Sequence, residues 1–163
     1  MFIRMKFNKS KLINHCVLPI LCLLSSSIHA TALDQYLIEK KLLNNDYTIA
    51  KTSELKELLA ALSDEDSRIL PLQIDQTTLI EQMRMYPDHL QLQGIITSAD
   101  FTQFAASQSK EKIHQLLTDG MLENCKQIFE NEFQRVNPYK AKLTLSSDKN
   151  IYHIEIINSQ CKF

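Results

Sequence analysis

Between residues 98 and 135, apolar side chains recur at intervals of three and four, the spacing of one face of an α-helix. The recurring residues are Ile113, Leu116, Leu117, Met121, Cys125, Ile128 and Phe129. The pattern predicts a long amphipathic helical segment with Cys125 on its inner face. Ser98 has a side chain suited to capping its start. Gly120 lies inside the segment, and a glycine costs a helix roughly 1 kcal/mol relative to alanine, so 98–135 is either one helix or two.

The pattern changes after Pro138 to alternation of apolar and polar residues, which is typical of strands that bury one face. Residues 139–145 and 151–157 alternate in this way around a polar turn at 146–150 and predict an antiparallel hairpin. Similar alternation over 70–86 and 90–96, on either side of a Pro-Asp turn, predicts a second hairpin.

Two helical patterns precede the strands, one over residues 33–43 and one over 53–62, the latter with Ser53 as its expected cap. The element order predicts an α+β fold. We expect an antiparallel sheet built from two hairpins (ββ-α-ββ), with N-terminal helices and a long central helix packed on the sheet.

The N-terminus has the features of a signal peptide over residues 1–32. It combines a basic start without acidic residues, an apolar run over 17–24 and the small residues Ala30-Thr31-Ala32, so we expect cleavage after Ala30 or Ala32. The apolar run is shorter than the roughly 20 residues of a membrane-spanning helix, and we expect no such helix in the mature chain. The rest divides into an N-terminal helical segment (33–67) and a disulfide-closed α+β domain (68–163).

Removal of residues 1–32 leaves two cysteines, Cys125 and Cys161, out of four. An even pair in an exported protein is most simply a disulfide, and the absence of a Cys-x-x-Cys motif weakens the alternative of a thiol catalyst. The expected compartment is the periplasm.

The charge of the mature chain argues against two classes of partner. The signal segment holds four of the 18 Lys and Arg residues and none of the 19 Asp and Glu residues, which leaves 14 basic and 19 acidic residues and a formal net charge of −5. Nucleic-acid binding requires a basic surface, so it is not expected, and the same charge disfavours an anionic membrane surface.

The run 70–78, Leu-Pro-Leu-Gln-Ile-Asp-Gln-Thr-Thr, is followed by two strands, a helix with one cysteine and a closing hairpin with another. Over residues 70–161 this arrangement resembles a loose group of small exported Gram-negative periplasmic proteins of unknown function, although the turn at 146–150 lacks the glycine expected there. Pilotins and accessory factors of secretion machinery are similar in size and style. The resemblance implies a disulfide-closed periplasmic domain and supplies no catalytic residue.

The sequence contains no recognisable catalytic motif, metal-binding motif or cofactor-binding motif. His89, His114 and His153 have no metal-ligand spacing, and two glycines in the mature chain cannot form a phosphate-binding loop. His153 and Glu155 lie two apart on one strand and so share a face, where a carboxylate could orient an imidazole. This pair keeps open the alternative of a small periplasmic hydrolase whose site is assembled from distant residues.

The expected function is therefore non-enzymatic binding of another periplasmic or envelope protein, as an envelope accessory or assembly factor or an immunity-type inhibitor. The last strand is apolar on both faces, and a hairpin at a sheet edge can pair with a partner unless helices cover both faces of the sheet. The candidate partner-binding residues are those on its outward face, Ile151, His153, Glu155 and Ile157.

Overall fold

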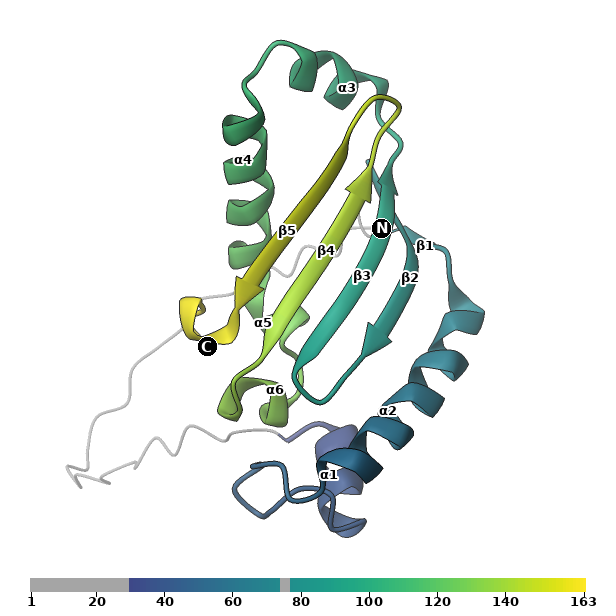
Figure 1. Ribbon diagram of the computed structural model, residues 1–163, viewed down its shortest axis with the longest axis vertical. Coiled ribbons are helices and arrows are strands. Elements are labelled where there is room, and N and C mark those ends of the chain that lie inside the picture. Colours follow the sequence, from purple (N-terminus) through teal and green to yellow (C-terminus); the bar gives the residue numbers. More distant parts are fainter. Residues whose placement is uncertain (1–29, 74–76) are drawn as a thin grey trace, which may run out of the picture.

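The computed structural model of the chain describes residues 30–73 and 77–163 (Figure 1). Most of the expected signal peptide, residues 1–29, lies outside the described residues. The described helices are α1 (Ala32–Glu39), α2 (Thr52–Asp66), α3 (Ala99–Ala106), α4 (Lys110–Glu123), α5 (Cys125–Ile128) and α6 (Glu132–Val136), with short 3-10 helices η1 (Ser67–Ile69) and η2 (Asn158–Gln160). The described strands are β1 (Leu72–Gln73), β2 (Thr78–Met85), β3 (His89–Ile96), β4 (Lys140–Ser146) and β5 (Ile151–Ile157).

The fold is α+β, as the sequence predicts, and the five strands form one sheet in the order β1-β2-β3-β4-β5. The expected β4–β5 hairpin is present, and β2 pairs with β3 as the second one. The expectation of a single strand over 70–86 is wrong, because this stretch holds two strands, β1 and β2, which pair with each other antiparallel. The expectation of a purely antiparallel sheet is wrong, because β3 and β4 pair in parallel from His89 opposite Lys140 to Ile95 opposite Ser146. Figure 1 shows the cause: α4 runs back along the sheet, and α5 and α6 deliver the chain to the end where β3 began. A strand that starts again from the same end must run parallel.

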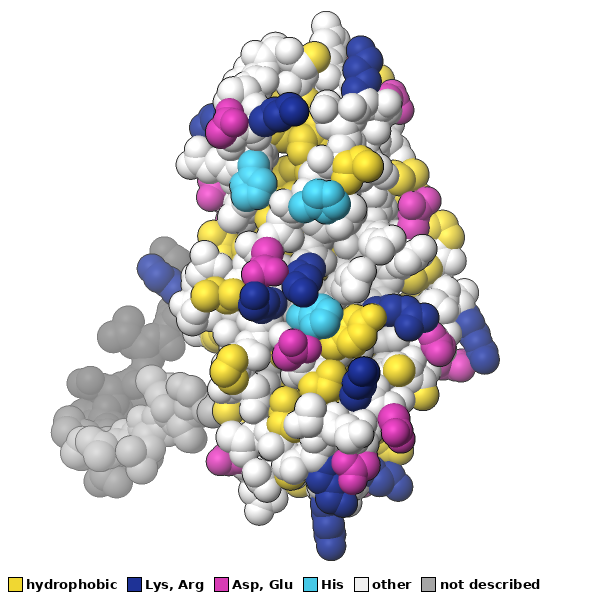
Figure 2. All heavy atoms as spheres, viewed as in Figure 1, with side chains coloured by type: hydrophobic (Ala, Val, Ile, Leu, Met, Phe, Trp, Pro, Cys, Tyr) yellow, Lys and Arg dark blue, Asp and Glu magenta, His cyan; other side chains and the backbone are white. Residues whose placement is uncertain are grey.

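The helices pack on one face of the sheet and leave the other open (Figures 1 and 2). Helix α2 packs against β2, and α4 packs beside β5. The largest buried side chains of the core include Leu37, Leu55, Leu59, Phe129, Phe133 and Tyr139. Residues from both 33–67 and 68–163 therefore share one core, and the open face of the sheet carries polar and charged side chains.

The helical segment 98–135 is first interrupted between α3 and α4, and not at Gly120. Ser98 caps α3 as predicted, accepting a hydrogen bond from the N–H of Phe101 at 3.2 Å. The chain then leaves the helix, and Ser109 caps α4 by accepting from the N–H of Lys112 at 3.2 Å. Gly120 lies inside α4. The segment therefore forms four helices, α3 to α6. The first break falls at the Ser109 cap and not at Gly120, because a serine cap defines a new start more strongly than one glycine disrupts a helix.

Helix α2 starts earlier and ends later than its sequence pattern predicts. Lys51, not Ser53, occupies its N-cap position. At the other end the buried hydroxyl of Ser63 donates to the carbonyl of Leu59 at 2.8 Å and accepts from the N–H of Met85 at 2.9 Å. Ser63 therefore attaches α2 to the end of β2.

Candidate functional site

Among the described residues, strand β5 forms one edge of the sheet and pairs on one side with β4. Its even-numbered residues face the helices and its odd-numbered residues face outward, in the alternation that the sequence predicts. Ile151 is 65 % exposed and Ile157 is 39 % exposed. The structure thus places the four candidate residues, Ile151, His153, Glu155 and Ile157, on the open face.

Those four residues do not form one continuous apolar surface. The Nζ of Lys140 donates to the carboxylate of Glu155 at 2.9 Å, and this hydrogen bond holds the pKa of Glu155 below its usual range. The Nδ1 of His153 lies 3.2 Å from the hydroxyl of Thr144. The polar partners of His153 and Glu155 therefore lie on β4, and the carboxylate is not the group that orients the imidazole. Ile151 and Ile157 belong to separate patches at opposite ends of the strand.

Two hydrogen bonds at the ends of the β4–β5 hairpin fix which backbone groups face the edge. The N–H of Ser147 donates to the carbonyl of Asn150 at 2.8 Å, and the N–H of Asn158 donates to the carbonyl of Tyr139 at 3.0 Å. Hydrogen-bonded and non-hydrogen-bonded pairs alternate in an antiparallel ladder, so every second residue of β5 directs its N–H and C=O away from β4. These residues are again Ile151, His153, Glu155 and Ile157.

At one end, this edge is closed by the chain itself. The N–H of Ile157 donates to the side-chain oxygen of Gln160 at 2.8 Å, so it is satisfied within the molecule. Among the residues that the structure describes, no such bond reaches the N–H groups of Ile151, His153 and Glu155. The free edge therefore runs from Ile151 to Glu155.

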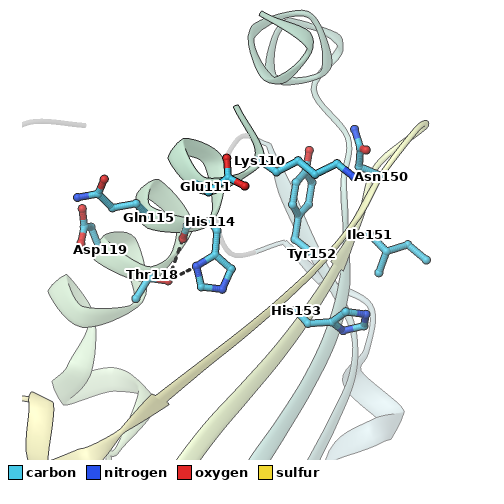
Figure 3. A pocket seen from close by; sticks show the side chains of 10 residues that line it. All are labelled: Lys110, Glu111, His114, Gln115, Thr118, Asp119, Asn150, Ile151, Tyr152 and His153. Carbon is cyan, nitrogen blue, oxygen red and sulfur yellow. Dashed lines mark hydrogen bonds between the residues drawn. The ribbon is translucent and has the colours of Figure 1, made fainter. Parts of the chain in front are cut away.

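A groove of about 640 Å³ lies between α4 and the first half of β5 (Figure 3). Its walls are formed by polar residues of α4, chiefly Lys110, Glu111, His114 and Thr118, and by residues 150–153. In Figure 3 the His114 ring points into the groove, whereas the side chains of Ile151 and His153 point to the other side of the strand. Hydrogen bonds from its own backbone and from Ser109 hold the pKa of Glu111 below its usual range, so this groove residue is an anion at neutral pH. The groove borders the free edge from Ile151 to His153.

A second hollow, of about 740 Å³, lies at the far end of β5. Three exposed apolar residues, Val136, Ile157 and Phe163, line it. The rings of Phe163 and Phe129 pack edge to face. The guanidinium carbon of Arg135 lies 5.0 Å from the centroid of the Phe163 ring. The predicted contact residue Ile157 thus belongs to this hollow rather than to the groove.

A disulfide between Cys125 and Cys161 holds the far end of β5, with their Cα atoms 5.8 Å apart. The side-chain amide of Asn158 lies within hydrogen-bond distance of three carbonyl oxygens at the end of α6, those of Gln134, Arg135 and Asn137. The bridge and the amide attach the far end of the strand to the helical layer.

Sequence reasoning did not identify the α4 wall of the groove. His114 has no metal-ligand spacing in the sequence, and no group of residues suited to a metal ion occurs in 30–73 or 77–163. A signal was available: Lys110, His114 and Thr118 are spaced by four and form a polar stripe along one side of the helix. Across the same described ranges, every helix is too short or too polar to span a bilayer.

No family model matches the chain, and no curated protein matches it. One solved structure, of a Pseudomonas aeruginosa protein provisionally described as secreted, is similar with a TM-score of 0.43 and 14% sequence identity. The match covers 69% of this chain and 97% of that chain. A likeness at this level transfers neither residues nor function.

Proposed function

We propose that this chain is an exported, non-enzymatic protein that binds an extended segment of another envelope protein. The bound segment adds to the sheet as a further strand along the free edge of β5. The observation that carries the proposal is the set of outward N–H and C=O groups from Ile151 to Glu155, bordered by a groove.

Export is supported by two independent features. The N-terminus combines basic residues, an apolar run and small residues in the order of a signal peptide. The Cys125–Cys161 disulfide fits an oxidising compartment, because cytosolic thiols are kept reduced. The periplasm meets both conditions and is the compartment that we propose.

Strand addition matches the shape of the site. Backbone hydrogen bonds provide the affinity in this mode of recognition, and alternate side chains of the bound strand provide the specificity. One set of side chains would enter the groove beside His114, and the other would lie over the open face beside Ile151 and His153. Because the disulfide holds β5 in place beforehand, little conformational entropy is lost on binding. An accessory or assembly factor of the envelope, or an immunity-type inhibitor, would use such an edge.

The test compares two substitutions at one position. His153→Pro removes an N–H that points to the edge and breaks no backbone bond to β4, whereas His153→Ala keeps that N–H. Both variants lose the contact between the imidazole and the hydroxyl of Thr144, so this loss does not distinguish them. The tagged full chain is expressed in its own host and cross-linked, and its partner is recovered from the envelope fraction. We expect the wild type and His153→Ala to retain the partner, and His153→Pro to lose it at least about tenfold, which corresponds to roughly 1.4 kcal/mol.

Thermal unfolding of both variants serves as the control. Retention of the partner by a folded His153→Pro variant would show that the backbone edge is not the contact. Loss of the partner in His153→Ala would assign the contact to the imidazole side chain instead.

A further inference from the structure

The carboxylate of Asp34, in the first turn of α1, is completely buried and accepts four hydrogen bonds. Two come from Thr31, from its backbone N–H at 3.2 Å and its hydroxyl at 2.8 Å. The other two come from the start of α6, from the N–H of Glu132 at 2.8 Å and the N–H of Phe133 at 3.2 Å. An ionised carboxylate can only accept hydrogen bonds, and the four donors around Asp34 match that form. Asp34 therefore places a negative charge where α1 meets α6.

This charge has no cationic partner in the part of the chain that the structure describes. The ion pairs among those residues involve other acidic side chains, and none includes Asp34. A buried charge without a counter-charge is costly even when it is well hydrogen-bonded. The site thus has its hydrogen-bond donors but lacks a positive charge.

Thr31 is positioned to supply that charge. It is the N-cap of α1, its hydroxyl also lies 2.7 Å from the side-chain oxygen of Asn131, and its backbone nitrogen lies 3.2 Å from Asp34. Hydrolysis of the Ala30–Thr31 peptide bond adds one water: the carboxylate leaves with Ala30, and the Thr31 nitrogen becomes an amine. A free α-amine is protonated at neutral pH, so this nitrogen gains a positive charge where it already contacts Asp34.

We propose that the signal peptide is cleaved between Ala30 and Thr31, and that the new α-ammonium of Thr31 forms a buried ion pair with Asp34. Processing then completes the contact between α1 and α6. The Ala30-Thr31-Ala32 spacing also permits cleavage after Ala32. That cut would remove the N-cap of α1 and two of the four donors to Asp34. The inference rests on the export part of the proposed function and is independent of strand addition at β5.

The intact mass of the mature protein tests the cleavage site. The full chain is expressed with its leader in a Gram-negative host and isolated from the periplasm. We expect a chain that starts at Thr31. A start at Leu33, or at any other residue of a processed chain, overturns this inference and leaves export intact. An unprocessed chain in the periplasm also overturns this inference, and absence of the chain from the periplasm overturns export.

Selective acetylation of the α-amine, at a pH where the lysine side chains stay protonated, tests the ion pair, because it removes this charge alone and leaves the protein sequence unchanged. We expect acetylation to lower the Tm of the mature protein by several degrees, and reductive methylation, which adds bulk but keeps the charge, to lower it much less. An unchanged Tm after acetylation overturns the ion pair. In Asp34→Asn the acetylation effect should disappear, and an effect as large as in the wild type would also overturn it. If Asp34→Asn does not fold, the wild-type comparison decides the question alone.

Discussion

Cys125, at the start of α5, and Cys161, just after η2, are joined by a disulfide across 36 positions of sequence. In the chain-entropy model a loop of this length stabilises the fold by about 4 kcal/mol. Because each kcal/mol shifts the Tm of a domain of this size by roughly 2 to 8 °C, replacing either cysteine with serine should lower the Tm by about 10 °C or more. Thermal unfolding followed by circular dichroism measures the effect.

The double serine variant serves as the control for this disulfide. Its Tm should be close to that of either single serine variant, because all three variants lack the same bond. Two titratable thiols in protein isolated from the periplasm would contradict the prediction.

The two glycines of the mature chain should respond to alanine in opposite directions. A Cβ at Gly94 would lie 2.5 Å from the carbonyl oxygen of Leu79, in the neighbouring strand β2. A Cβ at Gly120 would have nothing within 4 Å. We expect Gly94→Ala to destabilise the protein by about 1 to 3 kcal/mol and Gly120→Ala to stabilise it by up to about 1 kcal/mol. Urea unfolding of both variants checks this, and equal effects would contradict it.

The parts of the fold that sequence predicts are those with a local signal. The alternation over 139–145 and 151–157 is enough to define the β4–β5 hairpin, because a short turn fixes both its register and its faces. The outward side of β5 follows from the same alternation. The parallel pairing of β3 with β4 depends instead on where α4 to α6 return the chain, and no residue in either strand encodes that path.

The parts that sequence does not predict depend on contacts between distant residues. Asp34 looks like an ordinary first-turn acid of α1, yet it also binds the start of α6, 98 and 99 positions away. The groove requires α4 to lie beside β5, which the polar stripe of Lys110 and His114 allows but does not specify. Whether a charge is buried or a groove forms depends on how distant elements pack together. A local sequence pattern does not contain that information.

Tyr139 should make the stability of the protein depend on alkaline pH. Its ring is buried against Phe129 and Phe133, its hydroxyl donates to the carbonyl of Tyr86 at 2.9 Å, and burial raises the pKa of Tyr139 far above its usual value. A tyrosine in the unfolded chain ionises near pH 10, whereas the buried hydroxyl stays neutral. The folded pKa is the higher one, so the contribution of Tyr139 is fully present below about pH 10 and is lost as the pH rises above it.

Tyr139→Phe tests this dependence, because phenylalanine keeps the ring and has no hydroxyl to ionise. The variant should be less stable by about 1 kcal/mol at pH 7, through loss of the hydrogen bond to Tyr86. This difference should shrink or reverse between pH 10 and 11 in urea unfolding. Tyr36→Phe, at a ring that is 41 % exposed, is the control for loss of a surface hydroxyl. A difference between the wild type and Tyr139→Phe that stays constant up to pH 11 would contradict the prediction.

Ile151 and Ile157 should differ in their effect on partner binding, although both are exposed isoleucines on the same face of β5. Ile151 borders the groove and the free edge, whereas Ile157 lines the far hollow and its N–H is already bonded to Gln160. If a partner strand adds between Ile151 and Glu155, Ile151→Lys should abolish recovery of the partner from the envelope fraction, and Ile157→Lys should leave it nearly unchanged. Both variants should keep their stability within about 1 kcal/mol, because exposed positions tolerate a charge.

The reverse result would move the contact to the other end of the strand. Loss of the partner only in Ile157→Lys would assign it to the hollow beside Val136 and Phe163, where the disulfide fixes the surface and no free backbone edge is needed. Unfolding of Ile151→Lys would show that this side chain contributes to the core. Ile151→Val then separates the two roles, since a partner contact loses part of its affinity with one methyl group while the Tm stays nearly constant. A core position would lose stability instead, by about 0.5 to 1.5 kcal/mol.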